Sequence, residues 1–165
     1  MPYDPQKHHR RSIRIQGIDY SEPGAYYITI VTDNRAGILS TIRDGAIVLS
    51  LAGKAFFQIW QNLPRHYHHL ALGDIVIMPN HIHAVLYLNP GNIQPEAAIS
   101  EIIRALKSYS ARRINSLRHT PGKSVWQRDY FERIIRDQEE LDRIREYILT
   151  NPLQWELDQE NPENL

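Results

Sequence analysis

Residues 73–88 read GDIVIMPNHIHAVLYL, and the pair Pro79-Asn80 separates two apolar runs within them. Short apolar runs on both sides of a turn-forming pair predict two strands, 73–78 and 81–88, joined by a tight connection. An isolated strand pair is only marginally stable, so further strands and covering helices must come from the rest of the chain.

The segments on both sides of this hairpin carry strand or helix periodicity. The expected strands are 24–32, 46–50 and the second half of 125–136, and the expected helices are 51–63, 96–115 and 138–151. We expect Pro64 and Pro152 to end the first and last helices, and Asp137 to cap the last one, with Glu140 as its capping-box partner. This order predicts an α+β fold with a ferredoxin-like antiparallel or mixed sheet and helices packed on one face.

Composition restricts the class of protein. The chain has 165 residues, of which 42% are hydrophobic and 23% charged, so we expect a single globular domain over residues 1–165. It contains no cysteine, which excludes disulfide scaffolds and thiolate metal sites. We find neither a transmembrane run nor an apolar signal segment, so the expected location is the cytoplasm, with no membrane partner.

Charged residues are distributed unevenly, although the net charge is zero. We expect residues 1–22 to form a basic arm and residues 153–165 an acidic tail, and basic residues also gather on the helix expected at 96–115. This asymmetry is compatible with a DNA-binding surface, although solvated faces are the commoner explanation of charge runs. The candidate DNA-binding residues of the arm and helix are Arg10, Arg11, Arg14, Arg104, Lys107, Arg112 and Arg113.

His81 and His83 share one face of their strand because strand side chains alternate. We expect this to be the less buried face. Two neutral imidazoles on a rigid strand suit neighbouring coordination positions of a divalent metal, whereas an inert hydrogen-bonded pair is the commoner explanation of so short a pattern. His66 and His68 have the same spacing but fall in an expected loop, which would hold a metal less rigidly.

The last expected helix supplies groups that a histidine pair lacks. Tyr147 and Asn151 lie at i and i+4, and hence on one face of this helix. Asn151 offers a carbonyl oxygen as a third metal ligand, and a helix C-cap is its competing role. Tyr147 offers a phenol that can act as a nucleophile in covalent catalysis, and packing is its competing role.

These residues lie in stretches that resemble the HUH-type tyrosine transposases of the insertion-sequence 200-like superfamily, where HUH stands for His-hydrophobe-His. The REP-associated tyrosine transposase branch is the most similar, through MPNHIH, VWQRDYF and YILTNP in family order. The resemblance implies the HUH endonuclease form of the ferredoxin-like fold. It also implies that His81, His83 and Asn151 bind a divalent metal, Mg²⁺ or Mn²⁺, and that Tyr147 is the nucleophile.

The activity implied by the resemblance is metal-dependent cleavage and transfer of single-stranded DNA near hairpins or palindromic repeats, through a 5′-phosphotyrosine. In the family that the chain resembles, a histidine usually stands where FERIIR has Arg133, so efficient catalysis is in question and Arg133 becomes a candidate phosphate ligand. One alternative is a hairpin-binding protein of the same fold with weakened catalysis, and another is a metal-dependent hydrolase with a structural Tyr147. Insertion-sequence relatives act as homodimers, but the domesticated branch need not.

Overall fold

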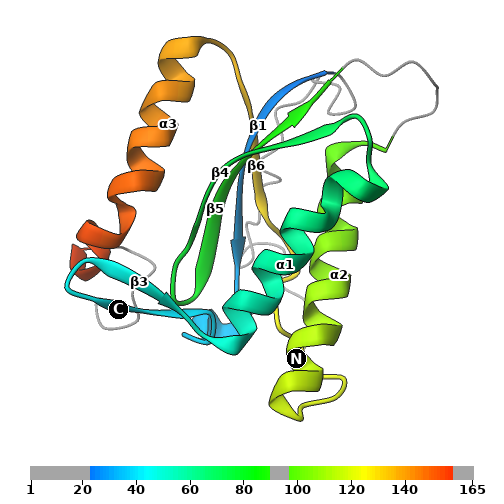
Figure 1. The fold of residues 1–165 in the computed structure, drawn as a ribbon, viewed down its shortest axis with the longest axis vertical. Coiled ribbons are helices and arrows are strands. Elements are labelled where there is room, and N and C mark those ends of the chain that lie inside the picture. The colour runs from blue at the N-terminus through cyan, green and yellow to red at the C-terminus, as the bar shows by residue number, and fades with distance from the viewer. Residues whose placement is uncertain (1–22, 90–96, 158–165) are drawn as a thin grey trace, which may run out of the picture.

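The structure is a computed structural model that describes residues 23–89 and 97–157. Its central sheet is antiparallel, with the strand order β4-β5-β1-β6 (Figure 1). The four strands are β1 (Gly24–Val31), β4 (Leu70–Ile77), β5 (His81–Leu88) and β6 (Phe131–Ile135). With one helix between β1 and β4 and another between β5 and β6, this is the expected ferredoxin-like α+β arrangement.

Helices cover both faces of this sheet (Figure 1). Helices α1 (Leu51–His66) and α2 (Ile99–Arg118) pack together over one face, as predicted. Helix α3 (Gln138–Thr150) departs from the prediction, because it lies against the other face. The physical reason is that this second face is also apolar over part of its area, where Val85 of β5 packs with Ile148 of α3.

Alternation along the strands divides their side chains between the two faces. In β1, Tyr26, Ile28 and Ile30 are fully buried in the larger core under α1 and α2. In β5, Ile82 and Leu86 enter the same core. The intervening side chains of both strands therefore face α3, and His81 and His83 are among them.

Helix α1 continues past Pro64 to His66, so the expectation that it ends at residue 63 is wrong. A proline inside a helix removes one backbone hydrogen bond, and near the helix end this loss is small. Leu63 stays buried in the main core, and the Tyr67 N–H donates to the Leu63 carbonyl at 3.0 Å to close the last turn. His66 is consequently helical, whereas a loop was expected there.

A separate two-stranded sheet precedes α1. It pairs β2 (Ser40–Arg43) with β3 (Ala46–Leu49), and the sequence interpretation missed β2. Asp44 and Gly45 connect the two strands with φ angles of 52° and 72°, the positive values that a two-residue hairpin turn requires. The Asp-Gly pair is the sequence feature that could have revealed β2.

The start of α3 follows the prediction in part. Asp137 caps the helix, since its carboxylate accepts from the Glu140 N–H at 2.8 Å. Glu140 does not close the expected capping box, because its carboxylate instead accepts from the Arg136 N–H at 2.9 Å and pairs with Arg133. After α3 the chain continues as a 3-10 helix, η2 (Asn151–Leu157). No helix within residues 23–89 and 97–157 has the length and apolarity needed to cross a membrane.

We predict that Gly53→Ala destabilises the protein, although alanine favours helices. A Cβ at Gly53 would lie 2.1 Å from the carbonyl oxygen of Leu39, against which the first turn of α1 packs. Overpacking of this kind lowers the free energy of unfolding by about 2 kcal/mol. Urea denaturation measures the free energy of unfolding of each variant. Gly24→Ala is the control, because a Cβ there meets nothing within 4 Å, and equal stability of the two variants would contradict the prediction.

Candidate active site

The second face of the sheet carries the candidate site. Antiparallel pairing places His83 of β5 beside Thr29 of β1, and Thr29 beside Phe131 of β6. In the next row, Tyr27 of β1 lies beside Arg133 of β6. The histidines, the polar side chains of β1 and the side chains of β6 therefore form one continuous surface under α3.

His83 is held by two hydroxyl groups of β1. Its Nδ1 lies 2.8 Å from both Tyr27 Oη and Thr29 Oγ1, and its ring stacks on Tyr27 with the centroids 5.7 Å apart. The other ring nitrogen, Nε2, lies 3.5 Å from Tyr147 Oη on α3. The structure thus brings together Tyr147 and one of the two predicted metal-binding histidines.

His81 is oriented by its chain neighbour. Its Nδ1 lies 2.8 Å from the amide oxygen of Asn80, which can only accept, so Nδ1 carries the proton and Nε2 is the basic nitrogen. The His81 ring centroid is 4.6 Å from that of His83 and 6.0 Å from that of Trp155 in η2. Burial, with a smaller contribution from the charge of Arg35, lowers the pKa of His81 to about 4. The imidazole is therefore neutral near pH 7, as a metal ligand must be.

The histidine face is more buried than the sequence predicted. His81 is 0% exposed and His83 is 6% exposed, because α3 and η2 cover them. Trp155, which takes part in this cover, belongs to η2. Residues 153–157 are therefore part of a 3-10 helix, where an acidic tail was expected. Residues 158–165, the remainder of that expected tail, lie outside the described residues.

Tyr147 and Asn151 differ in their access to solvent. Tyr147 is 40% exposed, and its ring centroid lies 5.1 Å from that of His83, so the residue is partly accessible from solvent beside the histidine. Asn151 is 2% exposed, and its amide oxygen is buried with no hydrogen-bond partner in the described part of the chain. Asn151 is the C-cap residue of α3, and its backbone is right-handed helical, with φ of −55°, unlike the left-handed conformation usual at Gly or Asn caps.

Several groups around the site were missed by the sequence interpretation. Asn80, Tyr27 and Thr29 orient the histidines, and alternation along the first strand could have placed the last two on the histidine face. Arg145 also escaped notice: its Nε donates to Asp74 Oδ2 at 2.8 Å and ties α3 to β4. No local pattern links these two residues, because they are far apart in the chain.

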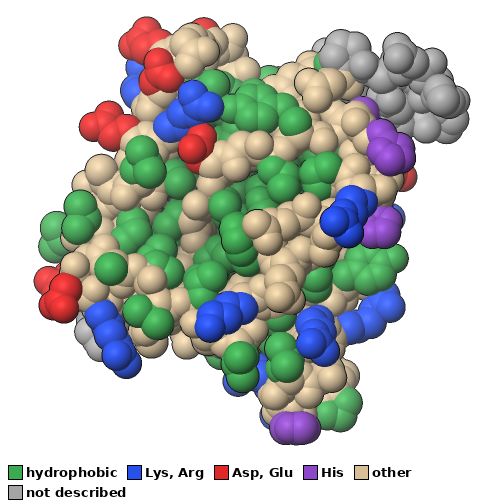
Figure 2. Space-filling view, viewed as in Figure 1, with side chains coloured by type: hydrophobic (Ala, Val, Ile, Leu, Met, Phe, Trp, Pro, Cys, Tyr) green, Lys and Arg blue, Asp and Glu red, His purple; other side chains and the backbone are tan. Residues whose placement is uncertain are grey.

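The candidate DNA-binding residues fall into separate groups. Arg10, Arg11 and Arg14 lie outside the described residues. Arg104, Arg112 and Arg113 are exposed on α2, which lies across the sheet from α3, and acidic side chains gather at the start of α3 (Figures 1 and 2). The structure therefore does not bring the arginines of α2 to Tyr147.

Lys107 is committed to the protein itself. Its amine donates to the carbonyl oxygens of Gln127 and Arg128 at 2.8 and 2.9 Å, and burial lowers its pKa. These bonds hold the segment that leads into β6. Lys107 thus has a structural role in the free protein, and its role in DNA binding stays a prediction.

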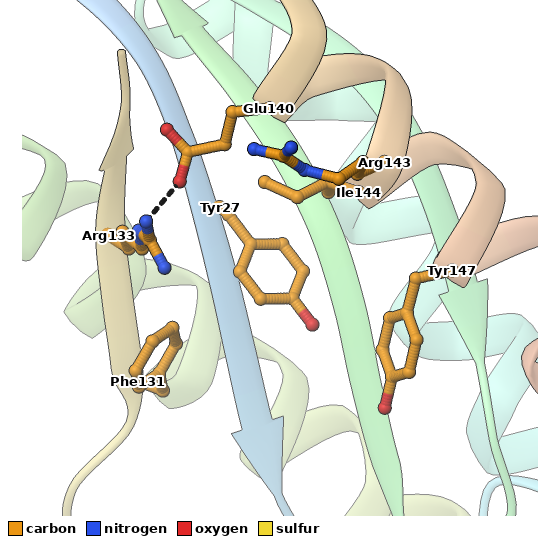
Figure 3. Close-up of a pocket in the computed structure, with 7 residues that line it drawn as sticks. All are labelled: Tyr27, Phe131, Arg133, Glu140, Arg143, Ile144 and Tyr147. Atoms are coloured by element: carbon orange, nitrogen blue, oxygen red, sulfur yellow. Dashed lines mark ion pairs between the residues drawn. The ribbon is translucent and has the colours of Figure 1, made fainter.

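Arg133, by contrast, lies at the same pocket as Tyr147, with Tyr27 between the two side chains (Figure 3). This pocket of about 290 Å³ lies between β1, β6 and α3. The expected metal site is elsewhere on the same face, at His81 and His83. No trio of His, Cys, Asp or Glu side chains that could hold a metal occurs in the described ranges, so a third ligand from these ranges would be of another type, such as an amide.

Comparison with known proteins connects this arrangement to one family. Residues 25–151 match the family described as "Transposase IS200 like". An uncharacterized protein of Haemophilus influenzae is 31% identical, over 95% of this chain and 96% of its own length. A second protein of that organism, provisionally named a REP-associated tyrosine transposase, is 29% identical over 82% of this chain and 73% of its own length.

Two solved structures share the fold. A REP-associated tyrosine transposase bound to a REP hairpin superposes with a TM-score of 0.61 at 17% identity, over 86% of this chain and 74% of its own. A provisionally named transposase of Deinococcus radiodurans superposes with a TM-score of 0.51 at 21% identity, over 82% of this chain and 95% of its own. At these identities, the likeness shows the fold alone.

We predict that the metal-free protein loses stability as the pH falls from 6.5 to about 4, through His81. The unfolded chain binds a proton at His81 below its ordinary pKa of 6.5, whereas the folded protein does so only near 4. Protonation therefore stabilises the unfolded state, and by pH 4 it lowers the free energy of unfolding by about 3 kcal/mol.

Urea unfolding at pH 7 and pH 4 with a chelator measures this loss, and comparison with His81→Gln isolates the contribution of His81. The variant should lose about 3 kcal/mol less than the wild type between the two pH values. Equal losses in both proteins would contradict the prediction.

Proposed function

Because the chain belongs to the family of IS200-like transposases, we propose that it cleaves and rejoins single-stranded DNA beside a hairpin, with Tyr147 as the nucleophile. One observation carries the proposal: Tyr147 Oη lies 3.5 Å from Nε2 of His83, so the phenol and the histidine pair form one site. The relative solved with a REP hairpin supports hairpin DNA as the class of substrate.

The proposed chemistry is a transesterification. The Tyr147 oxygen forms a bond to phosphorus while the bond from phosphorus to the 3′ oxygen breaks, which leaves a 5′-phosphotyrosine and a free 3′-OH. The phenol gives up its proton, and the departing 3′ oxygen takes one up. Attack by a second 3′-OH reverses the step and joins new ends, and no nucleotide hydrolysis is needed because each bond broken is replaced by a similar one.

The residues around the histidine pair fit a divalent metal. Nδ1 of each histidine has an oxygen partner, which directs Nε2 to a ligand, and Asn151 has a buried amide oxygen that lacks a partner in the described ranges. We propose that His81, His83 and Asn151 hold Mg²⁺ or Mn²⁺, and imidazole nitrogens favour Mn²⁺. When bound, the metal polarises the scissile phosphate and offsets the charge that develops on it.

The protein positions the nucleophile through the contacts of α3. Ile148, the next residue after Tyr147, is buried on the second face of the sheet. Arg145, two residues before Tyr147, pairs with Asp74 of β4. Tyr147 thus stands between two anchoring points, and such preorganisation lowers the entropy cost of bringing the phenol to the phosphate.

We propose that exposed arginines hold the DNA at a distance from the site. Arg104, Arg112 and Arg113 on α2 suit contacts to phosphates of a hairpin stem, as do Arg10, Arg11 and Arg14 outside the described residues. These contacts position the DNA without reading its sequence.

A second candidate function is hairpin binding with weakened catalysis. The departure at Arg133 favours it, because the guanidinium there pairs with Glu140 and stands where the resemblance implies a histidine. The two functions differ in one observable, a covalent protein–DNA adduct.

We predict that Tyr147→Phe abolishes the covalent adduct and strand cleavage while hairpin binding stays near the wild-type level. The variant lacks only the hydroxyl, so the ring keeps its packing against His83. Incubation of hairpin oligonucleotides with Mn²⁺, followed by denaturing electrophoresis, detects the adduct, and gel shift measures binding.

Tyr109→Phe is the matched control, because Tyr109 is also exposed but lies on α2. It should form the adduct at the wild-type level. Cleavage by Tyr147→Phe would remove Tyr147 from its proposed role, and absence of an adduct in the wild type would favour the weakened-catalysis function.

We also predict that Asn151→Ala weakens Mn²⁺ binding at least about tenfold, whereas Asn151→Asp retains binding, because a carboxylate is a good oxygen ligand. Calorimetric titration measures the affinity, and thermal melting separates it from stability. Asn115→Ala removes another buried asparagine, whose side chain bonds to Lys123 and Thr120, and should lower the melting temperature alone. Unchanged Mn²⁺ affinity in Asn151→Ala would exclude the ligand role.

A further inference from the structure

The pocket of about 290 Å³ beside Tyr147 is not used by the chemistry described so far (Figure 3). Tyr27 of β1 lies between Phe131 of β6 and the side chains of α3 in this view. The lining residues are Tyr27, Phe131, Arg133, Glu140, Arg143, Ile144 and Tyr147. The pocket thus shares a wall with the proposed nucleophile.

We propose that this pocket receives an unpaired nucleobase of the DNA strand, next to the phosphate that Tyr147 attacks. The inference rests on the proposed function, and it adds which part of the DNA the pocket binds. A nucleotide joins its base to its phosphates through a single sugar. A base in a pocket whose wall includes Tyr147 therefore leaves a neighbouring phosphate beside the phenol.

The aromatic lining suits a base. Tyr27 and Phe131 lie edge to face, with ring centroids 5.9 Å apart and planes at 68°, so they offer ring surfaces in two orientations. Bases stack on aromatic side chains whatever their sequence, because every base has a π face. A volume of about 290 Å³ is at the lower end of small-molecule sites and suits one base.

The charges around the pocket favour a neutral base over a phosphate. Arg133 pairs with Glu140, and Arg143 pairs with Glu139 at 2.9 Å. Each arginine is therefore matched by a carboxylate, and a phosphate inside would face the Glu140 carboxylate at close range. This balance argues against the expected role of Arg133 as a phosphate ligand.

The same ion pair can read the edge of a base. The Arg133 side chain is 49% exposed and has five N–H donors, of which its pairing with Glu140 uses only a part. The Glu140 carboxylate can accept from an amino group. Base edges present both acceptors and donors, so the Arg133–Glu140 pair supplies groups complementary to both.

The test is a scan of binding with abasic sites. The probe is a stem–loop DNA whose single-stranded flanks have been enriched for binding from a randomised pool, and a chelator prevents cleavage. Each flank nucleotide is replaced in turn by an abasic site, and dissociation constants are measured for the wild type and Phe131→Leu. Leucine keeps apolar volume but removes the ring. Phe57→Leu, the same change at a partly buried phenylalanine of α1, is the matched control.

We expect one flank position, or two adjacent ones, at which the abasic site weakens wild-type binding about tenfold, the scale of one base–aromatic stack. Phe131→Leu should weaken binding of intact DNA and be insensitive to the abasic site at that position. Phe57→Leu should behave like the wild type. Arg133→Met provides a second test at an exposed residue, and it should reduce the abasic penalty at the same position severalfold.

The outcomes separate this proposal from the proposed function. An abasic penalty that is the same in the wild type, Phe131→Leu and Arg133→Met at every position overturns the pocket, whether or not an adduct forms with Mn²⁺. We call a position coupled where the abasic penalty is smaller in the two variants than in the wild type. A coupled position that does not adjoin the phosphate mapped from the Tyr147 adduct also overturns the pocket. A coupled position without any adduct in the wild type supports the pocket and contradicts the catalytic role of Tyr147.

Discussion

The antiparallel pairing of β5 with β1 is the constraint on which the site depends. This register places His83 opposite Thr29 and Ile82 opposite Ile30, so one strand pair sends imidazoles to one face and aliphatic side chains to the other. A slip of one residue would exchange the faces and put the histidines in the main core. The burial of Ile28, Ile30, Ile82 and Leu86 under α1 and α2 therefore also fixes where the histidines lie.

Local sequence patterns were enough to predict the hairpin, the N-cap at Asp137 and the shared face of His81 and His83. They were not enough to predict how deeply the histidines are buried, because the covering residues Tyr147 and Trp155 come from the end of the chain. The Arg145–Asp74 pair and the exit of α3 to the second face also depend on packing between distant segments.

The missed strand β2 is a different case, because Asp44-Gly45 was a local signal. The position of Tyr147 relative to Asn151 follows from helical spacing. The proximity of Tyr147 to His83, however, does not follow from any local pattern in the sequence. The resemblance to a family supplied that expectation, and its proposed chemical consequence awaits the adduct experiment.

The groups that orient the histidines are neutral. Nδ1 of His81 contacts the amide of Asn80, and Nδ1 of His83 contacts the hydroxyls of Tyr27 and Thr29. A carboxylate in these places would also orient an imidazole, but it would add negative charge where the proposed DNA substrate would approach. The two carboxylates near the pocket, Glu139 and Glu140, are each matched by an arginine. The site thus orients both histidines through neutral groups and without added negative charge.

The two faces of the sheet also differ in the size of their apolar clusters. The cluster under α1 and α2 contains most of the buried side chains, whereas α3 rests on a small one around Val85, Ile135 and Ile148. Elements with few buried apolar contacts open locally at lower free energy than the rest of a protein. We therefore expect local opening of α3, which carries Tyr147, to require less free energy than unfolding of the histidine strands. The site is assembled from two units of unequal local stability, and the proposed nucleophile belongs to the weaker one.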